Sequence, residues 1–198
     1  LFRRTPALAL LGVLIATTQI VSAALELRFT GLVEQAFPET DSRTAYFAWF
    51  YGTLNAAAAA LQFAVAPVLL RLVSLRAVHA GIPLVHLGMG AALLLHPTLR
   101  TGAAAFMTFK ALDYSLFRAG KEILYIPFSF DVRYRAKEVI DAFVYRFSKG
   151  GLALLLALSG AVASLPGGSH AGIAVAASLV WLPAALRLTR PAAKGQNE

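Results

Sequence analysis

The sequence contains no cysteine, and only 14% of its 198 residues are charged. Without cysteine the chain has no disulfide, no thiolate metal ligand and no cysteine nucleophile. A typical soluble domain is about 25% charged and about 45–50% apolar, whereas 58% of these residues are apolar. So large an apolar share is tolerable only where much of the surface faces lipid, so the composition indicates an integral membrane protein.

Apolar stretches long enough to cross a bilayer, which takes about 20 residues, recur along the chain. Five of them lie at residues 6–25, 45–70, 77–95, 139–165 and 171–188. A sixth stretch, 99–125, is apolar at first and then carries charges. On a helix that turns 100° per residue, one side of this stretch would hold Lys110, Asp113, Tyr114, Phe117, Lys121 and Tyr125. Because the opposite side is apolar, we predict a spanning helix rather than a cytoplasmic loop. The whole chain, 1–198, is then a single all-α bundle of six transmembrane helices.

The positions of Lys and Arg predict how the bundle is oriented. With the N-terminus inside and six crossings, fourteen basic residues fall on the inside and three on the outside, while Lys110 lies within the membrane. This asymmetry is what the positive-inside rule predicts for cytoplasmic termini. The first external loop is expected to hold Glu26, Glu34, Glu39 and Asp41. Orientation explains the net charge of +8, so no nucleic-acid partner is expected. The Ala-, Leu- and Arg-rich composition favours a bacterial inner membrane.

Charged side chains within the spans are the candidates for function, because each costs roughly 2.5–3.5 kcal/mol deep in a bilayer. The fifth span has a polar stripe of its own, made of Glu138, Asp141, Tyr145, Ser148 and Lys149. Two facing stripes predict a cavity that holds both signs of charge. In one interpretation Lys110, Lys121 and Lys149 contact an anionic substrate, with Arg118 and Arg146 nearby, and the carboxylates Asp113, Glu122, Glu138 and Asp141 are switch partners or bind cations. In the other, these groups pair with one another and fix helix packing. Both stay open at this point, and Arg133, Arg135 and Lys137 are expected in a solvated loop.

Other polar residues carry weaker signals. Candidates to line the same cavity, or to hydrogen-bond between helices, are Thr17, Thr18, Gln19, Asn55 and Gln62. His79 and His86 lie two turns apart without a third ligand at metal spacing, so no metal site is expected. No phosphate-binding glycine loop, nucleophile elbow or zinc signature is present, and no cofactor is expected.

The segment from Phe109 to Gly151 resembles the nucleotide (ATP/ADP) translocase family, the NTP/NDP exchange carriers of plastids and intracellular bacteria. The pieces that carry the resemblance are Tyr114-Ser115-Leu116, Lys121-Glu122-Ile123-Leu124-Tyr125-Ile126-Pro127, Arg133-Tyr134-Arg135-Ala136-Lys137, Ile140-Asp141, Arg146 and Lys149-Gly150. They cover about a fifth of the chain closely. Elsewhere the agreement is in hydropathy and order.

The resemblance implies a fold like one half of a major facilitator superfamily transporter, in which two six-helix bundles flank a site that opens alternately to each side. This chain would be the second bundle. Its first, second, fourth and fifth helices would line the path, and its third and sixth would lie outside. Because the chain begins with Leu1, we expect a fragment of a longer carrier whose first bundle is the missing partner. The implied substrate is an ATP- or ADP-like nucleotide, and the candidate contacts are Lys110, Asp113, Tyr114, Arg118, Lys121, Glu122, Asp141, Arg146 and Lys149.

Two other classes of function are compatible with the residues. A non-transporting sensor or anchor would use the charges for packing, and its basic inner face would bind anionic lipid or a soluble domain. An intramembrane enzyme is the weaker alternative, because no nucleophile and base stand at a recognisable spacing.

Overall fold

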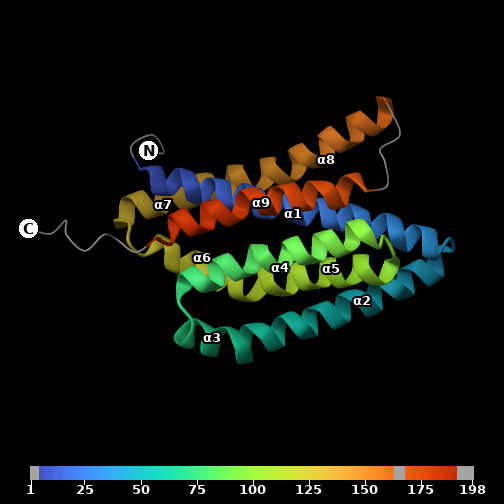
Figure 1. The fold of residues 1–198 in the computed structure, drawn as a ribbon, viewed down its shortest axis with the longest axis horizontal. Coiled ribbons are helices and arrows are strands. Elements are labelled where there is room, and N and C mark those ends of the chain that lie inside the picture. Colours follow the sequence, from blue (N-terminus) through green and yellow to red (C-terminus); the bar gives the residue numbers. More distant parts are fainter. Residues whose placement is uncertain (1–4, 163–167, 191–198) are drawn as a thin grey trace, which may run out of the picture.

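The structure is a computed structural model that describes residues 5–162 and 168–190, without the side chains of 141, 157 and 159–162. Its described residues are helical and contain no strand (Figure 1). The elements are α1 (Pro6–Ala36), α2 (Thr40–Ala60), η1 (Leu61–Val65), α3 (Ala66–Leu72), α4 (Leu75–Leu95), α5 (Leu99–Leu112), η2 (Asp113–Phe117), α6 (Arg118–Tyr125), α7 (Phe130–Val139), η3 (Ile140–Val144), α8 (Tyr145–Val162) and α9 (Ser169–Leu188).

Four helical segments within the described residues have the length and hydropathy of membrane spans. They are Pro6–Ala36, Thr40–Leu72, Leu75–Leu95 and Ser169–Leu188. This confirms an all-α, multi-pass membrane protein. The helix predicted over 99–125 is also present as α5, η2 and α6 without a break. It is not one of the four because the charged residues of its polar stripe make it less apolar than a typical span.

Three proline residues mark ends of helices. α1, α4 and α6 each end two residues before a proline, at Pro38, Pro97 and Pro127 respectively. Proline lacks the backbone N–H that a continuing helix needs, and it disfavours helical geometry in the residue before it. The chain therefore turns sharply at these points, and adjacent helices run antiparallel.

Two sequence predictions about segment ends were wrong. α1 continues past Leu25 to Ala36, so Glu26 and Glu34 lie in a helix and not in an external loop. It continues because Phe29 and Val33 are fully buried, which stabilises the extra turns by packing. The basic segment expected as a solvated loop is helix α7. Residues 163–165 of the predicted fifth span, the turn residues 166–167, Arg3, Arg4 and Lys194 lie outside the described residues.

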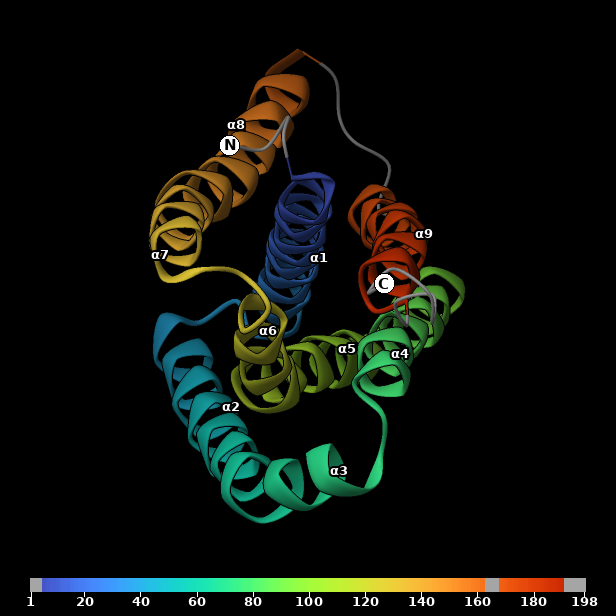
Figure 2. The same cartoon turned by 90° about the vertical axis from the view of Figure 1, so that its left-hand side faces the viewer.

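The helices are not all packed equally closely. α1, α4, α5 and α9 form the closely packed part, with α9 lying against both α1 and α4 (Figure 2). α2 joins this part through aromatic rings. The ring centroid of Phe29 in α1 lies 4.3 Å from that of Phe50 in α2 and 5.3 Å from that of Phe106 in α5. Towards α3 the second helix diverges from the others, and α8 diverges on the far side of α1 (Figures 1 and 2). The open side of the bundle therefore lies between α2 and α7–α8.

Within residues 5–162 and 168–190, three short π-helical turns interrupt otherwise α-helical segments. In each, a backbone N–H bonds to the carbonyl five residues earlier, from Ala66 to Leu61, Arg118 to Asp113 and Tyr145 to Ile140. Such turns are rare and often occur at functional sites. They place residues five apart on the same side of the helix, which a uniform α-helix does not.

Glycine at position 102 allows α5 to approach α1 closely. A Cβ atom at Gly102 would lie 2.6 Å from Cδ1 of Leu32, a core side chain that is only 5% exposed. We expect Gly102→Val to destabilise the protein by about 2 kcal/mol through overpacking, and to lower Tm by about 4–8 °C. Thermal unfolding of the purified protein measures this. Gly88→Val is the control, because a Cβ there has no neighbour within 4 Å, and equal losses at both positions would contradict the close approach.

Candidate functional site

A cavity of about 340 Å³ opens between α1, the η2–α6 segment and α8. It is lined by Ile15, Gln19, Asp113, Tyr114, Phe117, Arg118, Lys121 and Tyr145. None of these residues belongs to α4 or α9. We call it the first cavity. It brings together four of the predicted substrate contacts, namely Asp113, Tyr114, Arg118 and Lys121.

The π-helical turn η2 explains how Arg118 comes to share the cavity with Asp113. In a uniform α-helix, residues five apart point in different directions. Here the N–H of Arg118 bonds to the carbonyl of Asp113, so the two side chains follow each other on one side. Arg118 is exposed to the cavity. Its guanidinium makes no hydrogen bond or ion pair with the residues that the structure describes.

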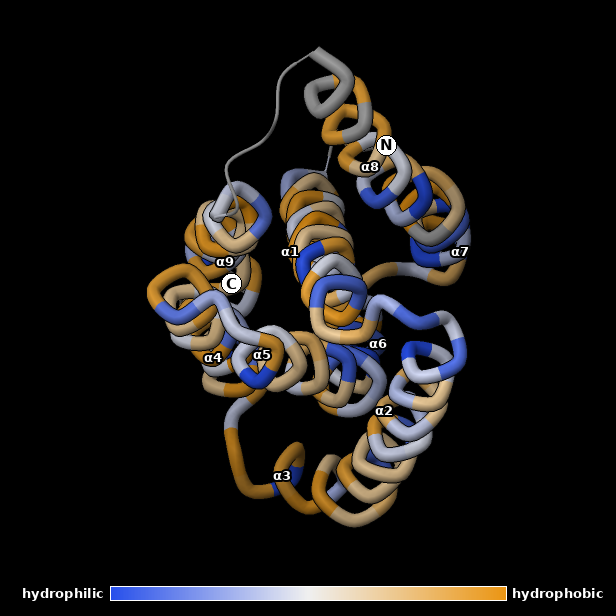
Figure 3. The backbone as a smooth tube through the Cα atoms, turned by 90° about the vertical axis from the view of Figure 1, so that its right-hand side faces the viewer, coloured by the Kyte–Doolittle hydropathy of each residue, from blue (hydrophilic) through white to orange (hydrophobic). Residues whose placement is uncertain are grey.

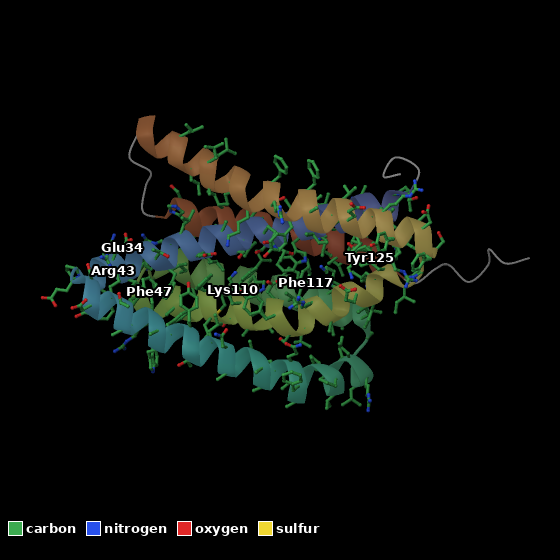
Figure 4. The ribbon with its side chains drawn as sticks, turned by 180° about the vertical axis from the view of Figure 1, so that it is seen from behind. Glu34, Arg43, Phe47, Lys110, Phe117 and Tyr125 are labelled. Carbon is green, nitrogen blue, oxygen red and sulfur yellow. The ribbon has the colours of Figure 1, made fainter. Side chains whose placement is uncertain are left out.

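Lys110 lies one turn from the first cavity and is held in place. Its Nζ donates a hydrogen bond to Oγ of Ser22 at 3.1 Å. It also lies 5.6 Å from the ring centroid of Phe106 and 5.5 Å from that of Tyr114, which are cation–π distances. Figure 4 shows Lys110 near the middle of the bundle's length, with Glu34 and Arg43 at one end and Tyr125 towards the other.

Lys149 forms an ion pair with Glu26 of α1, with Nζ and Oε2 2.7 Å apart. The two side chains are 38% and 33% exposed, so the pair is only partly shielded from solvent. Glu26 was missed in the sequence because it was assigned to a loop. The signal that could have found it is the spacing of Ile15, Gln19, Ser22 and Glu26, which recur every three to four residues and so share one side of α1.

The charges around Asp113 are mostly positive. Lys110, Arg118, Lys121 and Lys149 all act electrostatically on its carboxylate, and Glu26 is the other anion that acts on Lys110. Among these six groups, cations exceed anions by two. Within the described part of the chain, the carboxylate of Asp113 makes no hydrogen bond or direct ion pair. The site is therefore suited to an anionic ligand.

Two predicted contacts lie elsewhere, and one is not described. Glu122 points away from the first cavity and pairs with Lys137 at 2.7 Å. Arg146 is exposed and lines neither this cavity nor the one on the other side of α6. The side chain of Asp141 lies outside the described residues.

The weaker polar candidates divide between several roles. Gln19 lines the first cavity, whereas the hydroxyls of Thr17 and Thr18 donate to carbonyls of their own helix. His86 is buried between Phe109 and Trp181, with ring centroids 4.9 and 5.5 Å away. His79 lies against Gly120. Both histidines pack in the closely packed part of the bundle, away from the first cavity.

Hydrophilic residues gather on α6, which lines the first cavity, and on the neighbouring α7. Figure 3 shows them on α6 and α7, whereas α4 and α9 are mainly hydrophobic. Arg133 of α7 donates to the carbonyls of Ile126 and Phe128 at 2.9 and 3.1 Å. It therefore fixes the turn between the two charged segments.

Comparison with known proteins identifies the family. No curated protein and no solved structure matches this chain. The model of the TLC ATP/ADP transporter family matches residues 47–190, which is well over half of the chain and includes the η2–α6 segment, α7 and α8. Among the described groups around Asp113, positive charges exceed negative ones, which is consistent with a carrier of phosphorylated substrates. The chain belongs to the TLC ATP/ADP transporter family and is a multi-pass membrane protein that functions in nucleotide exchange.

Proposed function

We propose that the first cavity binds the phosphate groups of the transported nucleotide. The observation that supports this most directly is Arg118, which lines the cavity and has no partner among the described residues. Its guanidinium is exposed in the cavity, and its planar fork of donors matches phosphate oxygens. Lys121 lines the same cavity, and Lys110 and Lys149 stand behind it.

Asp113 and Glu26 have a different role in this proposal. Together they offset part of the positive charge when no nucleotide is bound. Four cations stand around these two carboxylates, so the empty site keeps a surplus of two positive charges, which the phosphate groups neutralise when they enter. Exchange of one nucleotide for another then costs less than opening an empty, strongly positive site.

We propose that 99–125 and 130–162 also cross the membrane, because Lys110 and Lys149 face α1, where they contact Ser22 and Glu26. This gives six spans arranged as in one half of a major facilitator superfamily transporter. A second six-helix bundle would cover the open side between α2 and α7–α8, and the site would lie between the two halves.

The distribution of basic residues between the two ends of the bundle indicates its orientation in the membrane. The start of α1, the end of α9 and the α3–α4 and α6–α7 turns lie at one end of the bundle (Figure 1). The basic residues Arg71, Arg76, Arg133 and Arg187 stand near this end in the chain. We propose that this end is cytoplasmic, in a bacterial inner membrane.

Uptake of labelled ATP into proteoliposomes loaded with ADP tests the phosphate site. We expect Arg118→Ala to weaken apparent ATP affinity at least about tenfold, because hydrogen bonds to charged groups contribute roughly 1.5–3 kcal/mol. The control is Arg135→Ala, which removes an exposed arginine that pairs with Asp131 outside both cavities. Normal ATP affinity in Arg118→Ala, or an equal loss in both variants, would contradict the proposal.

A further inference from the structure

A second cavity lies on the opposite side of the η2–α6 segment. Its volume is about 360 Å³, and α3 and η1 form its other wall. Gln62, Phe63, Pro67 and Leu70 come from that wall, and Tyr114 and Arg118 come from the η2–α6 side. Tyr114 and Arg118 also line the first cavity. The two cavities are therefore neighbours that share one wall.

The second cavity differs from the first in its chemistry. Apart from Arg118, its one charged side chain among the described lining residues is Glu122, which already pairs with Lys137. The remaining wall is mainly aromatic and aliphatic. The ring of Phe63 is 78% exposed, so one face is available for stacking. The second cavity suits a flat, uncharged group.

Gln62 is the polar exception in this wall. Its side chain is exposed and has no hydrogen-bond partner in the part of the chain that the structure describes. A primary amide offers two donors and one acceptor oxygen. It can therefore pair with a ring edge that presents a donor beside an acceptor, as the N6 and N7 edge of adenine does.

We infer that the second cavity is the nucleobase subsite of the transporter, in which Phe63 stacks on the base and Gln62 reads its edge. This inference rests on the proposed phosphate site in the first cavity. Arg118 and Tyr114 mark the boundary between the two subsites, where the ribose and the first phosphate lie. Each cavity is near the small end of the range of about 300–1,000 Å³ for ligand pockets, so the inference assigns the phosphates to one cavity and the base to the other.

Competition against labelled ATP in the full protein, reconstituted in proteoliposomes, separates the two subsites. The competitors are ATP, CTP and inorganic tripolyphosphate, which has the charges of a nucleotide without its base. We expect Phe63→Ala to weaken inhibition by ATP about tenfold, as base–aromatic stacking predicts, and to leave inhibition by tripolyphosphate unchanged. Phe63→Trp should restore ATP inhibition. Gln62→Leu should reduce the preference for ATP over CTP.

The control for a general effect of removing an exposed aromatic ring is Phe130→Ala. Phe130 is 80% exposed on α7 and lines neither cavity. Phe130→Ala should therefore leave inhibition by all three competitors unchanged. The inference is overturned if Phe63→Ala changes ATP and tripolyphosphate inhibition by the same factor, or changes neither. If Arg118→Ala still weakens inhibition by tripolyphosphate in that case, the phosphate site stands and only the base subsite fails. If neither nucleotide nor tripolyphosphate inhibits the wild-type protein, the phosphate site fails as well.

Discussion

Replacing Glu26 by lysine is expected to abolish nucleotide exchange and to lower the stability of the protein. The substitution would place a third positive charge beside Lys149 and near Lys110, where the native carboxylate lies 2.7 Å from Lys149 Nζ. Breaking a buried ion pair costs about 3–5 kcal/mol, whereas exposed pairs contribute about 0–1 kcal/mol. Because this pair is about one-third exposed, we expect an intermediate loss of about 2 kcal/mol.

The charge swap Glu26→Lys with Lys149→Glu tests whether the pair itself carries this effect. Each single variant should lower Tm by about 4–8 °C, and the double variant should recover most of the loss. Asp131→Lys is a matched control, because Asp131 pairs with Arg135 while both side chains are about 70% exposed. It should change Tm little. A double variant no more stable than either single one would show that Glu26 and Lys149 do not pair.

Lys110→Ala is expected to weaken nucleotide binding about a hundredfold. Lys110 Nζ has three protons to donate, and Ser22 is its one hydrogen-bond acceptor among the described residues. In the proposed site the remaining protons would bond to phosphate oxygens. The rings of Phe106 and Tyr114 hold the ammonium in position, so little side-chain entropy is lost on binding. Charge-assisted bonds in a site of low dielectric are worth up to about 3 kcal/mol, which corresponds to about a hundredfold in Kd.

Equilibrium binding of labelled ATP to the purified protein measures this effect, separately from transport. Lys110→Arg keeps the charge and should retain part of the affinity, whereas Lys110→Met keeps most of the side chain's bulk and should not. Wild-type affinity in Lys110→Ala would mean that the lysine serves packing alone. That was the alternative left open by the sequence.

The position of the helices and of most of the cavity could be predicted from the sequence, because hydropathy and the 100° rule act locally. Asp113, Tyr114 and Lys121 fall on one side of a regular helix, and the structure places them in one cavity. Arg118 was predicted as a contact from the family resemblance, but the 100° rule does not put it on that side of a regular helix. Arg118 joins them because η2 changes the helical register. No residue pattern in this segment predicts a π-helical turn.

The place of Glu26 in a helix could not be predicted from the sequence either. A carboxylate directly after an apolar run resembles the start of a loop, and the cost of burying it argues for that interpretation. The structure offsets the cost with Lys149, which is 123 positions away in the chain. Such a partner follows from the packing of α1 against α8, which local patterns do not determine. The second cavity was missed for the same reason, since it depends on how α2 diverges from the bundle.

Single-cysteine labelling shows whether the first cavity is a water-accessible nucleotide site. The chain has no native cysteine, so Tyr114→Cys, Tyr145→Cys and the control Thr40→Cys each introduce one unique thiol. We predict that a membrane-impermeant thiol reagent modifies all three, and that ATP or ADP protects positions 114 and 145 but not position 40. If positions 114 and 145 are inaccessible from both sides of the membrane, or react equally with and without nucleotide, the first cavity is not the transport site.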